Sequence, residues 1–189
     1  MQLPDVDIAM FHRDLTNSPK IPFPAGYQMR FYREGDISKW VEIQRSADSL
    51  YKVTAETFAS YLLGDTSFLS QRVMFLVDPS GRDIGSITAW QTADLPSINL
   101  ATKPFIGQVH WVAIVADQQG QGLAQPMLSA CCQRMIALGH QQACLSTNTK
   151  RIPALNLYRK FGFEPILLND TEKEAWSDIV PKLKYEENK

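Results

Sequence analysis

The chain has 189 residues, 44% of them apolar, which is enough for one folded domain with a sizeable core. Its 19 basic and 20 acidic residues nearly balance, which argues against a nucleic-acid-binding or polybasic membrane-binding surface. No apolar run is long enough to span a bilayer, and the first residues lack the pattern of a signal peptide. We therefore expect a cytoplasmic protein with no nucleic-acid and no membrane partner.

The first third of the sequence predicts a strand followed by two helices. Residues 1–25 form an N-terminal lead that ends in a proline-rich stretch, and residues 27–33 are expected to form the first strand. Asp36 is predicted to cap a helix with apolar residues at helical spacing. Thr54 is predicted to begin a second helix, which Gly64 ends.

A β-hairpin is predicted next. Residues 73–77 and 83–90 alternate or run apolar as strands do, and the turn DPSG joins them, so the sheet is at least partly antiparallel. Residues 91–107 have no clear period and read as a long loop, either functional or a plain surface excursion. The loop and the residue before it contain Trp90, Asp94, Lys103 and Phe105, which could line a binding pocket.

The second half alternates strands and helices, which is typical of one α/β domain. Strands are expected at 108–115, 142–148 and 163–168, and helices at 123–138, from Pro153 to Gly162, and at 174–183. We expect a single domain over residues 1–189, with a core at 26–166 and a C-terminal segment at 167–189.

A glycine turn, QQGQGLA, stands between the strand at 108–115 and the helix at 123–138. Its main-chain N–H groups are not screened by side chains, and the helix N-terminus adds unpaired donors and a partial positive charge. This combination predicts a phosphate site. A P-loop is excluded because no Lys-Ser or Lys-Thr follows, and a dinucleotide fingerprint is excluded because the third glycine and the later acidic residue are missing.

Two motifs resemble those of the GNAT superfamily of N-acetyltransferases. Gln119-x-x-Gly122-x-Ala124 matches the signature Gln/Arg-x-x-Gly-x-Gly/Ala, with a strand before it and an amphipathic helix after it. Residues 154–165, ALNLYRKFGFEP, are similar to the family's short helix that ends in Leu-Tyr-x-x-x-Gly-Phe. The order and spacing of both motifs agree with the family.

The resemblance implies a fold and a cosubstrate. The fold is a mixed, partly antiparallel central sheet flanked by helices, in which two central strands, containing Val112 and Leu145, splay apart to form a coenzyme A cleft. The cosubstrate is acetyl-CoA, whose pantetheine arm would lie between these two strands like an added strand and pair with the main chain of Val112 to Ile114. Its pyrophosphate would lie in the glycine turn. The cofactor-binding residues implied are Val112, Ala113, Ile114, Gln119, Gly120, Gln121, Gly122, Leu123, Ala124 and Gln125.

Tyr158 is the first catalytic candidate. It matches the family's helix tyrosine, which is assigned as the general acid for the leaving thiolate, and a phenol can donate such a proton. The alternative is a tyrosine that only packs, because Ala154, Leu157 and Phe161 share its apolar face.

His110 is the second catalytic candidate. Strand alternation places Gln108, His110 and Val112 on one face and Val109, Trp111 and Ala113 on the other, so His110 would face the acceptor if that face is open. Its imidazole titrates near neutrality and could serve as a general base. The alternative is that His110 is a structural histidine. In that case the enzyme has no dedicated base, and the amine enters uncharged.

The three cysteines and three histidines lack the spacing of a metal site, so we expect no metal. We expect Cys131 and Cys144 to pack in the core and Cys132 to be partly exposed. Reduced thiols fit a cytoplasmic protein.

The sequence thus predicts an enzyme that transfers acetyl from acetyl-CoA to a primary amine by direct attack in a ternary complex. The alternative is a non-catalytic acyl-CoA-binding module with the same fold, which the absence of an acidic base would favour. The acceptor is a small-molecule or peptide amine that the sequence does not identify, and the oligomeric state, a homodimer included, stays open.

Overall fold

The computed structural model describes residues 3–48, 52–62, 64–92 and 106–184. The chain divides into two compact units. The first unit comprises Met1–Pro19, Gln91–Gln108 and Leu138–Lys189, and the second comprises Lys20–Trp90 and Val109–Ala137. The predicted loop residues Asp94, Lys103 and Phe105 lie outside the described residues.

Seven strands pair in the order β2-β3-β4-β5-β6-β1-β7. The pairings of β1 with β6 and β7, and of β3 with β2 and β4, are antiparallel, whereas β5 pairs in parallel with β6 at Gly107–Ala143 and Gln108–Cys144. The prediction of a mixed, partly antiparallel sheet flanked by helices is confirmed.

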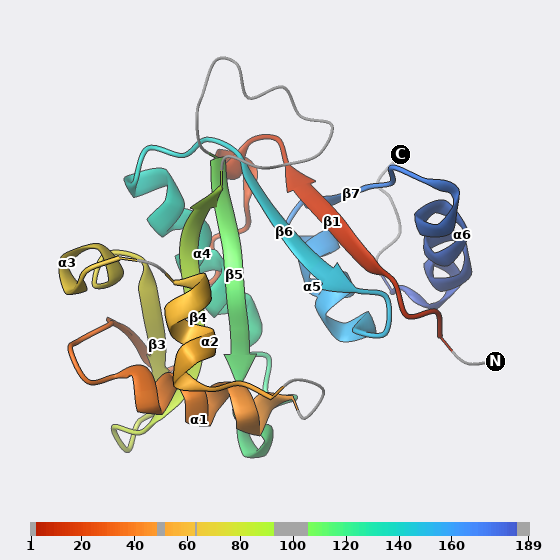
Figure 1. Cartoon of the computed structure of the whole chain (residues 1–189). Coiled ribbons are helices and arrows are strands. Elements are labelled where there is room, and N and C mark those ends of the chain that lie inside the picture. The colour runs from red at the N-terminus through yellow and green to blue at the C-terminus, as the bar shows by residue number, and fades with distance from the viewer. Residues whose placement is uncertain (1–2, 49–51, 63, 93–105, 185–189) are drawn as a thin grey trace. The chain divides into compact units, whose positions relative to one another are not determined.

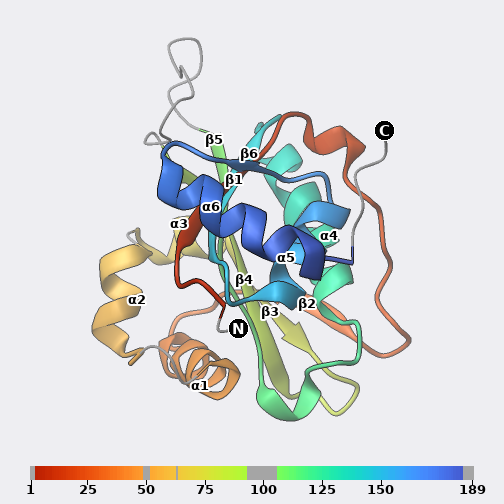
Figure 2. The ribbon, with the colours of Figure 1, turned by 90° about the vertical axis from the view of Figure 1, so that its right-hand side faces the viewer.

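The second unit holds four strands between two layers of helices. The strands are β2 (Gln28–Phe31), β3 (Val73–Val77), β4 (Asp83–Thr92, up to Trp90) and β5 (Ile106–Ile114, from Val109). The helices are α1 (Ile37–Ala47), α2 (Ala55–Tyr61), α3 (Thr66–Leu69) and α4 (Ala124–Ala137). Figures 1 and 2 show α1 and α2 on one face of these strands and α4 on the other. Every residue of β3 is buried, as expected for a strand covered on both faces.

The first unit contains a strand that the sequence reading missed. β1 (Asp7–His12) lies within the segment interpreted as a lead, and it pairs with β6 (Ala143–Asn148) on one side and β7 (Glu164–Ile166) on the other. Ile8 and Met10 are fully buried there. The unit also contains α5 (Ile152–Lys160) and α6 (Asp170–Ile179), and α6 begins earlier than predicted because Asn169 caps it, accepting from the Glu172 N–H.

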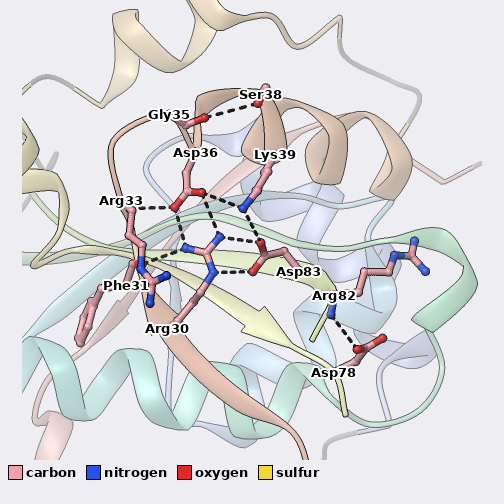
Figure 3. A network of polar contacts seen from close by, with 10 residues as sticks. All are labelled: Arg30, Phe31, Arg33, Gly35, Asp36, Ser38, Lys39, Asp78, Arg82 and Asp83. Carbon is pink, nitrogen blue, oxygen red and sulfur yellow. Dashed lines mark hydrogen bonds and ion pairs between the residues drawn. The ribbon is translucent and has the colours of Figure 1, made fainter. Parts of the chain in front are cut away.

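Asp36 has a different role from the one predicted. It occupies the N-cap position of α1, but its side chain makes no cap hydrogen bond. Its carboxylate instead accepts from the guanidinium of Arg30 at 2.6 Å and from the Arg33 N–H at 2.8 Å (Figure 3). The same guanidinium pairs with Asp83 on β4 at 2.6 Å, so one arginine on β2 ties the start of α1 to β4. Thr54, by contrast, begins α2 as predicted, and the structure adds that it caps the helix in a capping box with Thr57.

Candidate active site

The glycine turn has the open main chain that the sequence predicts. Gly120 and Gly122 have φ angles of 77° and 78°, in the left-handed region that favours glycine. A Cβ atom built on either residue would have nothing within 4 Å, so the turn has free space around it. The turn follows a short 3-10 helix, Ala116–Gln118, and leads into α4.

The main-chain donors of this turn are available to a ligand. Among the described residues, no partner accepts a hydrogen bond from the N–H groups of residues 120–124, whereas the Gln125 N–H donates to the Gly122 oxygen at 3.2 Å. Five neighbouring free N–H groups at the N-terminus of a 14-residue helix favour an anion. No basic side chain stands between residues 119 and 125, so within this segment the main-chain N–H groups are the donors best placed for an anion.

Three side chains of the turn contact other parts of the protein. Gln119 Nε2 donates to the Ile114 oxygen at 2.9 Å and to the Ala47 oxygen at 3.1 Å. Leu123 is buried in the core of the second unit. The exposed Gln121 donates to the Gln118 side chain at 3.0 Å. Side chains here therefore shape the turn, and the main chain is what faces a ligand.

After Trp111, the main-chain N–H and C=O groups of β5 point alternately toward β4 and away from it. The Val115 N–H donates to the Ile84 oxygen of β4 at 2.9 Å, and a Cβ on Gly85 would meet the Ala113 oxygen at 2.9 Å, so residues 113 and 115 face β4. In an antiparallel ladder the intervening residues direct their polar groups to the other edge. Val112 and Ile114 therefore present main-chain donors and acceptors on the edge away from β4.

The alternation breaks at Trp111, which corrects the sequence prediction for this strand. Trp111 has a φ of 51°. Simple alternation places His110 and Trp111 on opposite faces, but both rings contact that of Tyr61, at centroid distances of 5.9 and 5.4 Å. The left-handed conformation of Trp111 interrupts the alternation as a β-bulge does, so two consecutive side chains, those of His110 and Trp111, lie on one side of the strand.

His110 lies in an aromatic and uncharged environment. Its ring is 5.5 Å from that of Trp111, and Tyr61, on α2, is 55% exposed beside it. Burial lowers the pKa of His110 from 6.5 to about 4. The imidazole is therefore uncharged at neutral pH.

Tyr158 lies in the first unit, on the buried face of α5. It is 7% exposed, and its ring packs edge-on against Phe163 at 6.1 Å. Its main-chain oxygen accepts from the Phe163 N–H at 3.0 Å, and Gly162, with a φ of 89°, completes this helix end. The predicted helix and its apolar face are thus confirmed. The other predicted site residues, His110 and residues 112–125, belong to the second unit.

All three cysteines are buried. Burial raises the pKa of Cys144 to about 12 and that of Cys131 well above its usual range, so neither thiol is a ready nucleophile. Cys132 is 1% exposed, and the expectation of partial exposure is wrong because this side of α4 also faces the core. Among the described residues, no cluster of His, Cys, Asp or Glu could hold a metal ion.

Sequence reasoning missed Gln44, a buried residue of α1 that contacts this strand. Its Nε2 donates to the Trp111 oxygen at 3.0 Å and to the Ser86 Oγ at 2.9 Å. The available signal was its place on the apolar stripe of the helix, four residues after Trp40. A polar residue at such a position needs a buried partner.

Residues 70–165 match the family described as the acetyltransferase (GNAT) domain. The chain belongs to the GNAT acetyltransferase family. The matched segment contains the glycine turn, β5 and α5, so this GNAT-family chain carries both motifs within the family's own region. Membership supports an acyltransferase enzyme.

Curated relatives of this GNAT protein include two mycothiol acetyltransferases. The Arthrobacter protein is 28% identical over 150 residues, which cover 77% of this chain and 45% of the relative. The Corynebacterium aurimucosum protein is 35% identical over 60 residues, 32% of this chain and 20% of the relative. The chain thus spans less than half the length of these relatives.

Solved structures share the fold. A GCN5-related N-acetyltransferase from Sphaerobacter thermophilus superposes with a TM-score of 0.68 at 22% identity, over 86% of this chain and 49% of that one. An acetyltransferase of the GNAT family from Colwellia psychrerythraea gives 0.62 at 10% identity, over 86% and 54%. No helix in the described parts of this GNAT chain is both long and apolar enough to cross a membrane.

Proposed function

We propose that this chain is an N-acetyltransferase that transfers the acetyl group of acetyl-CoA to a primary amine by direct attack in a ternary complex. The observation that carries the proposal is the row of five N–H groups at residues 120–124, which have no partner in the described parts of the chain and lie at the start of α4, with free space around Gly120 and Gly122. These donors suit the pyrophosphate of coenzyme A. Family membership supports acetyl transfer as the reaction.

Main-chain groups of β5 hold the rest of the cosubstrate in this proposal. Val112 offers its N–H and C=O groups and Ile114 its N–H on the edge away from β4, which suits the amide groups of the pantetheine arm, while the Ile114 oxygen accepts from Gln119 Nε2. Ala113, which faces β4, keeps this edge in place. Gln119, Gly120, Gln121, Gly122, Leu123, Ala124 and Gln125 form the pyrophosphate turn, with Gln119 and Leu123 acting as its supports.

Proton transfers are assigned to Tyr158 and His110. The amine nitrogen attacks the thioester carbon, the C–S bond breaks, and the phenol of Tyr158 donates a proton to the leaving thiolate. A free alkylammonium has a pKa of about 10.4. Because the pKa of His110 is about 4, its imidazole is too weak a base to deprotonate that ammonium. The amine therefore enters uncharged, and His110 accepts the proton only from the nitrogen that has already attacked.

Calorimetric titration with acetyl-CoA tests the proposal. We expect saturable binding by the wild-type protein and its loss in Gly122→Glu, because a carboxylate there repels the pyrophosphate. Gly81→Glu is the matched control: Gly81 has a φ of 88° and equally open surroundings, but it lies in the β3–β4 turn. Wild-type protein that binds no acetyl-CoA, or equal losses in both variants, would refute the assignment.

A second measurement separates the enzyme from an acyl-CoA-binding module without turnover. The wild-type protein is incubated with acetyl-CoA and a panel of small-molecule and peptide amines, and free coenzyme A is assayed. Amine-dependent release supports the acetyltransferase. Tight binding with no release for any amine supports the binding module.

A further inference from the structure

Strand β5 contains a main-chain conformation that its residue disfavours. Within the described part of the chain, Trp111 is the only non-glycine residue with a positive φ, at 51°. A side chain at Cβ disfavours this region, so the surrounding structure must stabilise it. We call this position the Trp111 kink.

The amide of Gln44 is a direct support of the kink. Gln44 is 7% exposed, and its Nε2 donates to the Trp111 oxygen at 3.0 Å. The same Nε2 donates to the Ser86 Oγ of β4 at 2.9 Å, and Ser86 is fully buried. A carbonyl that leaves the strand ladder inside a protein needs another donor, and Gln44 supplies it.

Helix α1 also holds the side chain of the kinked residue. Trp40, one turn before Gln44, packs its ring edge-on against that of Trp111 at 5.0 Å. Trp40 is fully buried. The ring of Trp111 is thus fixed by Trp40 and its carbonyl by Gln44, both from one face of the same helix.

The kink sets which residues of β5 present their main chain on the free edge. After it, residues 113 and 115 face β4, and residues 112 and 114 face away. Because strand alternation has a period of two, relaxing Trp111 to an extended conformation would shift this phase by one residue. The N–H and C=O groups that Val112 and Ile114 present would then turn toward β4.

We propose that Gln44 is a positioning residue for acyl-CoA, which acts by holding the Trp111 carbonyl so that the main chain of Val112 and Ile114 faces the pantetheine arm. The inference rests on the proposed function, since it concerns the same strand. Gln44 touches neither the acyl group nor the amine in this assignment. Its loss is therefore expected to raise the Kd and the KM for acetyl-CoA more than it lowers kcat.

The test compares two variants that break different hydrogen bonds of one amide. Gln44→Met keeps the length of the side chain and removes both donors, whereas Ser86→Ala removes only the bond to β4 and leaves the bond to Trp111. We expect Gln44→Met to weaken acetyl-CoA binding about tenfold and Ser86→Ala to change it by less than about twofold. Thermal unfolding of both variants reports their general loss of stability.

Gln44→Glu gives a second test if Gln44→Met does not fold. The carboxylate cannot donate to the Trp111 oxygen, but the protonated carboxyl can. Relative to wild-type protein at the same pH, its acetyl-CoA affinity is expected to be lower at about pH 8 than at about pH 5.5. A constant ratio across this range overturns the inference.

The outcomes separate the inference from the proposed function. Wild-type protein that does not bind acetyl-CoA overturns the proposed function and this role with it. Wild-type binding with unchanged affinity in Gln44→Met overturns the inference alone. Equal weakening in Gln44→Met and Ser86→Ala also overturns it, because the effect would then follow general loosening of the core.

Discussion

The side chain of Gln119 donates a hydrogen bond to the main-chain oxygen of Ile114 at 2.9 Å. The same Nε2 reaches the oxygen of Ala47, at the end of α1, at 3.1 Å. One amide therefore joins the end of β5, the end of α1 and the start of the glycine turn. The turn is held in shape by a side chain that faces the protein.

Removing this amide should loosen the turn. Gln119→Met is expected to weaken acetyl-CoA binding about tenfold and to lower the free energy of unfolding by about 1 kcal/mol, because two main-chain oxygens lose a donor. Calorimetry and urea unfolding measure the two effects. Gln118→Met is the control, since the Gln118 side chain bonds those of Gln121 and Asp117 and neither of the two main-chain oxygens that Gln119 holds. Equal affinity in the two variants would contradict a bracing role for Gln119.

The Arg30 ion pairs should matter far more than an exposed pair in the same unit. Arg30 bonds Asp36 and Asp83, whose side chains are 6% and 12% exposed (Figure 3). Arg30→Met leaves two mostly buried carboxylates without their arginine and is expected to cost about 3 kcal/mol in unfolding free energy. Arg82→Met breaks the pair with Asp117, both about half exposed, and should cost less than about 1 kcal/mol. Urea unfolding of both variants at one pH checks the difference.

His110 should make the protein less stable as the pH falls. Its pKa is lowered from 6.5 to about 4 by burial, so below pH 6.5 the unfolded chain takes up a proton that the folded chain does not. Stability is then lost progressively as the pH falls from 6.5 to about 4, by at most about 3 kcal/mol, and no further below that. His110→Phe should remove this component.

Unfolding free energies of wild-type and His110→Phe protein, measured between pH 4 and pH 8, isolate the effect. The difference between the two curves cancels the contributions of other groups, including His12, whose pKa burial also lowers. A difference that does not vary with pH would show that His110 is not desolvated. In the same range, kcat/KM should follow the ionisation of the amine with no inflection near pH 6.5.

Any side chain at Gly162, at the end of α5, should lower the free energy of unfolding. Gly162 has a φ of 89°, and a Cβ there would lie 3.0 Å from His12 Nε2. That imidazole is fixed between the Asp14 N–H and the Ser18 hydroxyl, so it has little freedom to move aside. Gly162→Ala is expected to cost the strain of the left-handed region, about 1–2 kcal/mol, plus about 1 kcal/mol for this contact.

Gly139→Ala is the matched control for Gly162→Ala. Gly139 has a φ of 88° and nothing within 4 Å of an added Cβ, so only the conformational strain applies. Urea unfolding gives both costs. If the two variants lose the same unfolding free energy, the contact with His12 does not contribute to the cost of Gly162→Ala.

Local sequence patterns determined most elements and the motif residues of this protein. The hairpin at residues 73–90, the cap at Thr54 and the strand–turn–helix around Gly122 follow from periodicity and turn chemistry, which depend on neighbours along the chain. The matches at Gln119 and Tyr158 indicated the family for the same reason, because each motif is a contiguous stretch.

The tertiary structure decided what those residues contact. β1 was missed because its six residues are too short a pattern to predict a strand by themselves. The strand forms by pairing with β6 and β7, which lie far along the chain. The Trp111 kink, its support by Gln44 and the lowered pKa of His110 depend on burial against α1 and α2, which no local pattern records. Periodicity is a property of the chain, whereas strain, desolvation and hydrogen-bond partners are properties of the packed protein.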